Sequence, residues 1–487
     1  MASTQPFSFD NTFARELEGL YEPWTPAKVP DPELLVLNEP LALDLGIDID
    51  WLRSPSGIAV LAGNEVPVGA TPIAQAYAGH QFGGYSPRLG DGRALLLGEV
   101  IDSHGRRRDL HLKGSGRTPF ARGGDGKAAV GPMIREYVIG EALHGLGMPT
   151  TRALAVVATG EVIRREQPLP GAVVTRVAAS HLRVGTCQFV AATGDRTQLE
   201  RLVAYTIERH YPDARNDGPP AIALLRAVAA AQASLIAQWM LIGFIHGVMN
   251  TDNMTLSGES IDFGPCAFMD AFDPATVFSS IDHQGRYAYG NQPAIGQWNL
   301  ARLAEALLPL IDDQQERAIE LATAELRGYV DTYNANWQAG MLAKLGFGTP
   351  PPDTTIVDEF VEILTMQRTD YTASFRELAD SIRGAAPSTV IDETPALVAW
   401  SQRWRAALGP TDPTSIADNM DRRNPVYVAR NHLVEDALRA ATDGDLAPTE
   451  RLVDVLREPY TARPGLEPFA LAAPRQFTDQ YQTFCGT

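Results

Sequence analysis

Apolar and polar residues follow two different patterns along this chain, and the change between them falls near residue 196. From about residue 70, short apolar runs alternate with glycine-rich turn clusters, which is typical of strands joined by turns. The runs 94–100 and 106–116 predict two of these strands. The stretch 151–165 predicts a hairpin, because two β-rich runs in it flank Thr159-Gly160-Glu161.

Helical periodicity accounts for most of the rest. Residues 132–146 predict a helix that Pro132 opens and a pair of glycines closes, with Glu136 beside its apolar face. Helices are also expected at 196–210 and at 221–243. The second of these is apolar nearly all round, which indicates a buried core helix and is too mixed for a membrane span. The chain therefore predicts an α+β fold in which a small, mostly antiparallel sheet precedes a helical region.

These patterns divide the chain into four parts. Residues 1–65 form an N-terminal extension that packs on the outside of the core, with a partly helical apolar run at 33–47. Residues 66–195 form a small lobe and residues 196–460 a large helical lobe. Residues 461–487 form a C-terminal tail that contains proline and glycine.

Composition and charge narrow the class of protein. The 487 residues carry a net charge of −18 and no basic cluster, so we expect no nucleic-acid partner. The N-terminus lacks the basic and apolar regions of a secretory signal, and no apolar run reaches the ~18 residues of a membrane span. We therefore expect a cytoplasmic protein with no membrane partner. The three cysteines share no short metal-ligand spacing, so no zinc site is expected.

The stretch 246–264 carries the strongest chemical signal. His246 and Asn253 are seven residues apart, as in the catalytic loop H-R-D-x-x-x-x-N of protein kinases, and Asp262-Phe263-Gly264 follows them. The kinase aspartate is replaced by Val248, which neither accepts a proton nor binds a metal. Asn253 and Asp262 offer the hard oxygen donors that suit Mg²⁺ or Mn²⁺. Asp252 is the nearest carboxylate that could replace the missing base.

Other parts of a nucleotide site precede this stretch in kinase order. Gly90 and Gly92 would let a loop backbone approach phosphates closely. Lys113 on a strand and Glu136 on the next helix are arranged like the ion pair that positions a phosphate-binding lysine. Each signal alone is weak, since a lone G-D-G or D-F-G is usually a turn. Because all of them occur together in kinase order, they indicate a nucleotide site.

These segments resemble the SelO family, the protein-kinase-like proteins that act as protein adenylyltransferases. The resemblance spans nearly the whole chain, through the stretches 88–100, 109–155, 175–189, 246–270, 424–438 and 451–460. It implies a protein-kinase-like bilobal fold with an N-terminal extension and helical C-terminal additions. It further implies that ATP is bound turned round relative to kinases. AMP would then pass to Ser, Thr or Tyr hydroxyls of proteins while pyrophosphate leaves.

The resemblance also assigns roles to individual residues. Asp252 would be the proton acceptor, Asn253 and Asp262 would hold the metal, and Asp262 would also contact the nucleotide. The other implied nucleotide contacts are Gly90, Gly92, Arg93, Lys113, Asp125, Gly126, Arg176 and Arg183. The forked donors of the three arginines suit phosphate oxygens at the relocated β and γ positions.

The resemblance suggests a regulatory role for two of the cysteines. Cys266 lies two residues after Gly264, and Cys485 is third from the C-terminus, where selenoprotein members of the family carry selenocysteine. We hypothesise that a Cys266–Cys485 disulfide regulates activity by redox state. Equal thiol counts and equal activity with and without reductant would refute this hypothesis.

The residues alone leave two other functions open. One is a kinase that transfers the γ-phosphoryl group, because attack at either phosphorus needs the same positioning and charge neutralisation. The other is a catalytically silent nucleotide-binding scaffold, which the missing kinase aspartate would ordinarily favour. Whether UTP can replace ATP, with transfer of UMP, is also left open.

Overall fold

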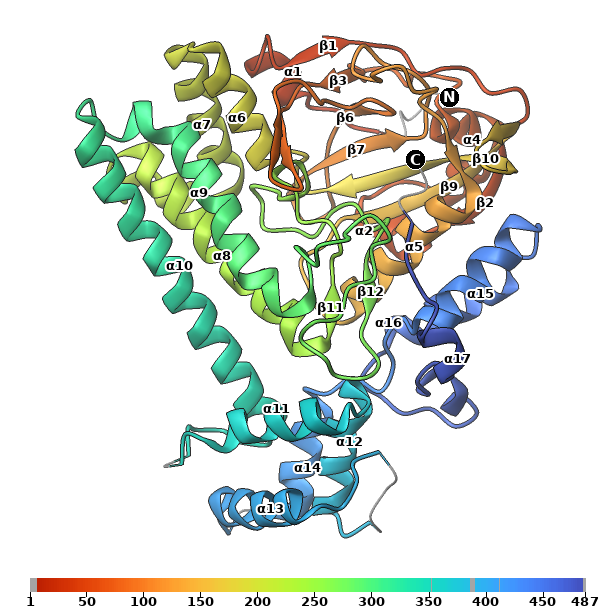
Figure 1. The fold of residues 1–487 in the computed structure, drawn as a ribbon. Helices are drawn as coiled ribbons and strands as arrows, with labels where there is room; N and C mark the ends of the chain where they lie inside the picture. The colour runs from red at the N-terminus through yellow and green to blue at the C-terminus, as the bar shows by residue number, and fades with distance from the viewer. Residues whose placement is uncertain (1–6, 352, 386–389, 411, 485–487) are drawn as a thin grey trace.

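The protein folds into a sheet-based lobe and a larger helical lobe (Figure 1). The computed structural model describes residues 7–351, 353–385, 390–410 and 412–484. The sheet lobe comes from the first part of the chain, and the helical lobe comes from the part after residue 183. This arrangement confirms the α+β class and the two-lobed, kinase-like architecture that the sequence predicts.

The sheet of the small lobe is antiparallel throughout, with strand order β1-β3-β6-β7-β10-β9-β2 and β8 paired to β10. The strands are β1 Tyr21–Pro23, β2 Glu33–Leu37, β3 Ile73–Gln75, β6 Ala94–Ile101, β7 Arg107–Lys113, β8 Ala128–Ala129, β9 Arg152–Arg164 and β10 Pro168–Ala178. The two strands predicted from 94–100 and 106–116 are therefore confirmed. Leucines and valines from both faces of the sheet are buried, because helices or the N-terminal segment cover each face.

The predicted hairpin at 151–165 is wrong. Residues 152–164 form the single strand β9, which pairs with β10 on both sides of Gly160. The register shifts between Pro170 and Ala172, so the three residues from Thr159 to Glu161 face only Gly171. Gly160 has a φ of +72°. A glycine in this conformation permits a bulge within a strand as readily as a turn, so the sequence signal was the same for both.

The N-terminal segment is more integrated than the sequence indicates. Its strands β1 and β2 are the two edge strands of the main sheet. The run 33–47 is partly strand: β2 is followed directly by the helix α2 Glu39–Asp44, and Pro40 lies in the first turn of that helix. Three short helices complete the segment, α1 Thr12–Glu16, α3 Ile49–Arg53 and α4 Pro55–Ala62.

The helix α5, Val130–Gly145, confirms the helix predicted at 132–146 and is buried along most of its length. One side packs on β9 and β10, and the other side packs on two helices from near the C-terminus, α15 Asn431–Thr442 and α16 Ala447–Arg457 (Figure 1). Arg457 joins the two layers through a 3.0 Å ion pair with the fully buried Glu141. The end of the chain therefore returns to support the helix that carries Glu136.

The helical lobe is built around α8. Its helices are α6 Val184–Thr193, α7 Arg196–His210, α8 Pro220–Ile242, α9 Gln292–Ile311, α10 Gln315–Lys344, α11 Ile356–Gln367, α12 Tyr371–Ile382, α13 Pro395–Leu408 and α14 Pro413–Asp421. Within the described part of the chain, α8 alone is long and apolar enough to cross a membrane. However, 67% of its apolar window is buried inside the protein, where it packs on α9 and α10. It is the core helix that its pattern predicts.

Two small hairpins lie where the lobes meet. Strands β11 Phe244–Ile245 and β12 Ala267–Phe268 pair at the base of the loop 246–264. Strands β4 Gly79–Gln81 and β5 Gly84–Ser86 form a hairpin that packs on the same loop. The tail contains the short helix α17 Arg475–Thr478, which lies near α15 (Figure 1).

Candidate functional site

A buried ion-pair cluster joins the two lobes. Lys113, at the end of β7, donates a 2.7 Å hydrogen bond to Oε1 of Glu136 on α5 and a 2.6 Å hydrogen bond to Oδ1 of Asp262. Lys113 and Glu136 are nearly inaccessible, whereas a third of the Asp262 side chain is exposed. The predicted pairing of Lys113 with Glu136 is therefore present, and Asp262 completes it. The exposed part of Asp262 is accessible to a ligand.

The charges of this cluster keep Asp262 ionised. Burial alone would raise the pKa of its carboxyl, but Lys113, Arg176 and Arg93 outweigh burial and hold the pKa well below its usual range. Asp262 also has a φ of +69°, a left-handed conformation that few non-glycine residues adopt. A backbone in this conformation needs support from its surroundings.

Two neighbouring residues of α5 supply that support by holding both ends of Phe263. Glu136 Oε1 accepts a 3.2 Å hydrogen bond from the backbone N–H of Phe263, and Arg135 Nε donates a 3.1 Å bond to its carbonyl. Arg135 also donates a 2.5 Å bond to the Cys266 carbonyl. The Arg135 side chain is buried and reaches the end of the chain, pairing with Glu435 at 3.1 Å and contacting the Tyr481 hydroxyl at 3.4 Å. Arg135 thus ties the Asp262 segment to α15 and to the tail.

Replacing Arg135 by methionine should lower kcat by a factor of about 10–100, in the range found for residues that orient metal ligands. The KM for ATP should change much less, because Arg135 holds Phe263 and does not reach the exposed side of Asp262. Steady-state kinetics would measure both constants, and Arg135→Lys should restore part of the lost kcat. Arg439→Met is a matched control, since Arg439 is exposed and, among the residues that the structure describes, its one ion pair is with Asp436. An Arg135→Met enzyme with wild-type kcat would show that the clamp is dispensable.

The loop 246–264 has a kinase-like frame around an apolar position. His246 is fully buried and shares a 2.9 Å hydrogen bond with the Ile261 carbonyl, just before Asp262. Val248, at the position of the kinase base, is buried. Asn253 Nδ2 donates a 3.1 Å bond to the Val248 carbonyl, so the amide nitrogen is used and the amide oxygen is left for other partners. The loop therefore offers no proton acceptor at position 248.

Asp252 is the carboxylate that the loop does offer. The residue is 8% exposed, and Oδ2 accepts a 3.3 Å hydrogen bond from Gln81 Nε2. Oδ1 is buried without a hydrogen-bond partner among the described residues. Burial raises the pKa of the Asp252 carboxyl to about 6, against the opposing charge of Arg183. An unpartnered oxygen on a carboxylate with a pKa near neutrality is suited to accepting a proton.

Two buried arginines act electrostatically on the two aspartates, Arg183 on Asp252 and Arg176 on Asp262. Arg176 on β10 lies 3.8 Å from Glu136 Oε2, and Arg183 donates a 2.9 Å bond to the Asp252 carbonyl. Arg183 also lies 3.8 Å from Asp91 and stacks over the ring of Tyr77. Both guanidinium groups are almost fully buried. Together they place two positive charges between the lobes, where phosphate groups could be bound.

The loops that carry the remaining predicted contacts are packed closely. A Cβ at Gly90 would lie 2.3 Å from the Phe120 ring, and one at Gly126 would lie 2.2 Å from the Gly116 backbone. A Cβ at Gly92 would lie 2.9 Å from the Phe120 carbonyl oxygen. Gly90 and Gly92 therefore let their loop pack against Phe120, and Gly126 lets its own loop fold closely against Gly116. Asp125 lies apart from the cluster, in a 2.7 Å ion pair with Arg165, and its nucleotide contact stays a prediction.

The regulatory disulfide also stays a prediction. Cys266 is buried, and burial raises the pKa of its thiol to about 12. Thr483 Oγ1 donates a 2.7 Å bond to the carbonyl of Pro265, which brings the tail beside Cys266. Cys485 lies outside the described residues.

Sequence reasoning missed several residues that hold the site. Arg135 precedes Glu136 in the predicted helix, and a helical arginine is usually solvated. Gln81 and Asp91 lie in a glycine-rich stretch that carries no charge pattern of its own. Their roles depend on contacts with Asp252 and Arg183, which are distant in sequence. For Asp91 the sequence did offer a signal, because it lies between Gly90 and Gly92, which were both predicted to contact the nucleotide.

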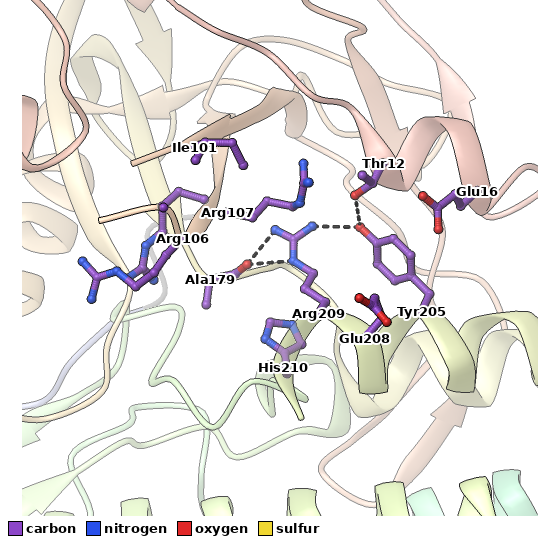
Figure 2. Close-up of a pocket in the computed structure, with 12 residues that line it drawn as sticks. Thr12, Glu16, Ile101, Arg106, Arg107, Ala179, Tyr205, Glu208, Arg209 and His210 are labelled. Atoms are coloured by element: carbon purple, nitrogen blue, oxygen red, sulfur yellow. Dashed lines mark hydrogen bonds between the residues drawn. The ribbon is translucent and has the colours of Figure 1, made fainter. Parts of the chain in front are cut away.

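A separate cavity of about 450 Å³ lies between the β6–β7 turn and α7 (Figure 2). Its arginines are already engaged: Arg209 contacts the Tyr205 hydroxyl and the Ala179 carbonyl and pairs with Glu99 and Asp109. Arg107 pairs with Asp10 at 2.6 Å. These contacts join α7 and the N-terminal segment to the sheet, so we assign this cavity a structural role.

Comparison with known proteins agrees with this geometry. The profile of the family described as "Protein adenylyltransferase SelO" matches residues 4–457. A "Protein nucleotidyltransferase YdiU" from Mycolicibacterium smegmatis is 58% identical over 494 residues, covering 100% of both chains. One from Cereibacter sphaeroides is 57% identical over 484 residues, covering 99% of this chain and 100% of its own.

Among solved structures, the chain is similar to ROP2 from Toxoplasma gondii, described as a virulence factor with a protein-kinase fold and no enzymatic activity. The identity is 11% and the TM-score 0.27, with 69% of this chain and 88% of that chain covered. A likeness this distant decides nothing about activity. The family match and the full-length relatives do decide the family. The chain belongs to the SelO family of protein adenylyltransferases.

Proposed function

We propose that this enzyme transfers AMP from ATP to Ser, Thr or Tyr hydroxyls of other proteins and that Asp252 accepts the hydroxyl proton. The family is one of protein adenylyltransferases, which supports transfer of a nucleotide to protein. One observation carries the assignment of the base. Asp252 has a buried oxygen to which no described residue bonds and a pKa of about 6, whereas the kinase position holds the apolar Val248.

In the proposed reaction the acceptor hydroxyl gives its proton to the Asp252 carboxylate. The acceptor oxygen forms a bond to the α-phosphorus, and the bond from that phosphorus to the bridging oxygen breaks. Pyrophosphate leaves with the electron pair of that bond. Lys113, Arg176 and Arg183 would lower the cost of the negative charge that gathers on the phosphates. Their positions are already fixed by Glu136 and by the backbone of the loop.

Asn253 and Asp262 would hold the Mg²⁺ or Mn²⁺ that travels with the nucleotide. Lys113 uses only Oδ1 of Asp262, and the amide oxygen of Asn253 is not used by the Val248 bond. Within the described part of the chain, no group of three or more His, Cys, Asp or Glu side chains could hold a metal alone. Two oxygen ligands completed by phosphate and water suit Mg²⁺. When bound, the ion would neutralise phosphate charge.

Labelled ATP tests the proposal. Acceptor protein should retain label from ATP marked at the α-phosphate and none from ATP marked at the γ-phosphate. Label from the γ-phosphate alone would establish a kinase instead, and no label with intact nucleotide binding would establish a scaffold. The same assay with α-labelled UTP would decide whether UMP is also transferred.

A further inference from the structure

We propose that the β4–β5 hairpin and the residues beside its tip form the docking surface for the acceptor protein, and that this surface selects hydroxyl residues within acidic segments. The inference rests on the proposed AMP transfer and adds the chemistry of the acceptor. We define the hairpin surface as His80, Phe82, Tyr85, Arg286 and Trp298. The first three belong to the hairpin, and Trp298 lies on α9.

The hairpin is built directly on the loop that carries Asp252. Three consecutive hairpin residues bond to three consecutive loop residues. The bonds run from His80 N to Thr251 Oγ1 at 2.6 Å, from Gln81 Nε2 to Asp252 Oδ2 at 3.3 Å and from Phe82 N to Asn250 Oδ1 at 3.0 Å. A molecule bound to the outer side of this hairpin would therefore be held next to the proton acceptor.

The hairpin backbone also lies against the Asp252 carboxylate. A Cβ at Gly79 would be 2.6 Å from Asp252 Oδ1, so a larger residue there would displace the carboxylate. Gly79 and Gln81 thus cover part of the Asp252 carboxylate, which agrees with the 8% exposure of this residue. An acceptor hydroxyl that reaches Asp252 would therefore lie close to this hairpin. The hairpin is consequently placed to select what arrives.

The tip of the hairpin holds a residue that the turn itself disfavours. Phe82 has a φ of +50° and Gly83 a φ of +86°, the pattern of a two-residue type I′ turn. Asparagine, aspartate or glycine suits the first of these positions, and a bulky L-residue is strained there. Phe82 is nevertheless 37% exposed, so its ring is only partly covered by the edge contact that it makes with the buried Tyr287. Strain at an exposed aromatic residue beside a catalytic loop indicates a function other than folding.

The rest of the surface is aromatic and positively charged. Tyr85 is 45% exposed and its ring contacts that of His80 at a tilted angle, and the His80 ring also contacts Trp298. The Arg286 guanidinium lies 4.7 Å over the Trp298 ring. Arg286 forms no ion pair with any described residue, although most arginines of the described chain have a carboxylate partner. A positive charge is thus left available in a protein whose net charge is −18.

These features fit one kind of occupant. Exposed aromatic rings provide contact area at low entropic cost, as they do in many protein interfaces. A carboxylate on the acceptor would pair with Arg286 over Trp298 through the terminal nitrogens of the guanidinium, because its Nε is buried. The acceptor is therefore inferred to be a segment in which acidic residues flank the Ser, Thr or Tyr.

Two peptides that share a central serine test this inference, one flanked by aspartates and the other by lysines. With α-labelled ATP, the full-length enzyme should label the acidic peptide with a kcat/KM about fivefold or more above that of the basic peptide. Arg286→Glu should reverse the preference, and a gain with the basic peptide is a result that misfolding does not produce. Arg327→Glu, which changes an exposed arginine of α10, should leave the preference unchanged.

The outcomes separate this inference from the proposed function. Equal labelling of both peptides, labelling of neither while proteins are still labelled, or an unchanged preference in Arg286→Glu would overturn the docking surface alone. If α-labelled ATP labels no protein at all, the proposed AMP transfer fails and the docking inference fails with it.

A second variant removes the strained ring without disturbing the turn. Phe82→Asn places a residue that suits the type I′ turn, so Tm should be equal to or above that of the wild type. The KM for the acidic peptide should rise about fivefold or more, whereas ATP affinity measured by calorimetry should stay the same. An unchanged peptide KM in a stable Phe82→Asn enzyme would remove Phe82 from the surface.

Discussion

Replacing Asp252 by asparagine should lower AMP transfer by a factor of about 10²–10⁴ while making the protein more stable. The loss of rate follows because an amide does not accept the proton of the hydroxyl. The gain in stability follows from burial: the pKa of Asp252 is raised from 3.8 to about 6, so its ionised form is disfavoured in the folded state. Asparagine keeps the shape and can still accept the bond from Gln81.

The sign of the pH effect follows from the same shift. A carboxyl whose pKa is raised on folding stabilises the protein below its unfolded pKa, and that contribution is lost as pH rises through about 6. At neutral pH the ionised Asp252 therefore costs about 1–3 kcal/mol, which asparagine would remove. Thermal melts at neutral pH and at pH about 4 measure this, and the difference in Tm between wild type and variant should vanish at the lower pH.

The rate should depend on pH in the matching direction. Asp252 accepts a proton only when ionised, so wild-type kcat should fall about tenfold per pH unit below pH about 6, and the residual rate of Asp252→Asn should lack this slope. A stable Asp252→Asn enzyme with wild-type turnover would remove Asp252 from the mechanism.

Replacing Asp262 by alanine should abolish transfer, with a loss of at least about 10³, and should make the protein less stable. Lys113 would keep Glu136 but lose its second carboxylate, and Arg176 would lose a compensating charge. We expect a loss of about 1–2 kcal/mol, reduced because a third of the Asp262 side chain is exposed to solvent. The pKa of Asp262 is depressed on folding, so its contribution is present above its unfolded pKa and is lost as pH falls.

The substitutions at the two aspartates are therefore expected to change the stability of the protein in opposite directions, although both lower its activity. Parallel melts of Asp252→Asn and Asp262→Ala at neutral pH give the comparison. A rise in Tm for the second variant would contradict the stabilising cluster around Lys113 and Asp262.

The order of motifs in the sequence was sufficient to predict the Lys113–Glu136 ion pair, but not that Asp262 pairs with the same lysine. Lys113, Glu136 and Asp262 each carry a weak signal, but a strand lysine, a helix glutamate and an Asp-Phe-Gly in this order require one another for phosphate chemistry. The helix at 132–146 and the core helix at 221–243 were predictable because their periodic runs are long.

Contacts between distant segments were not predictable in this way. Arg135 meets Glu435 and Tyr481, which follow it by 300 and 346 residues, and no local pattern announces such a pairing. The strands of the N-terminal segment take both edges of the sheet, and such short strands carry little periodicity. Gly160 misled the prediction because a positive φ serves a bulge as well as a turn.

The identity of the group attached to the acceptor tests the central claim most directly. After incubation with ATP and Mg²⁺, mass spectrometry of an acceptor protein should show the mass of AMP on a Ser, Thr or Tyr side chain. The adduct should be absent with Asp262→Ala and strongly reduced with Asp252→Asn. A phosphate adduct in place of AMP would contradict the account, because it would show that the γ-phosphorus reacts at this site.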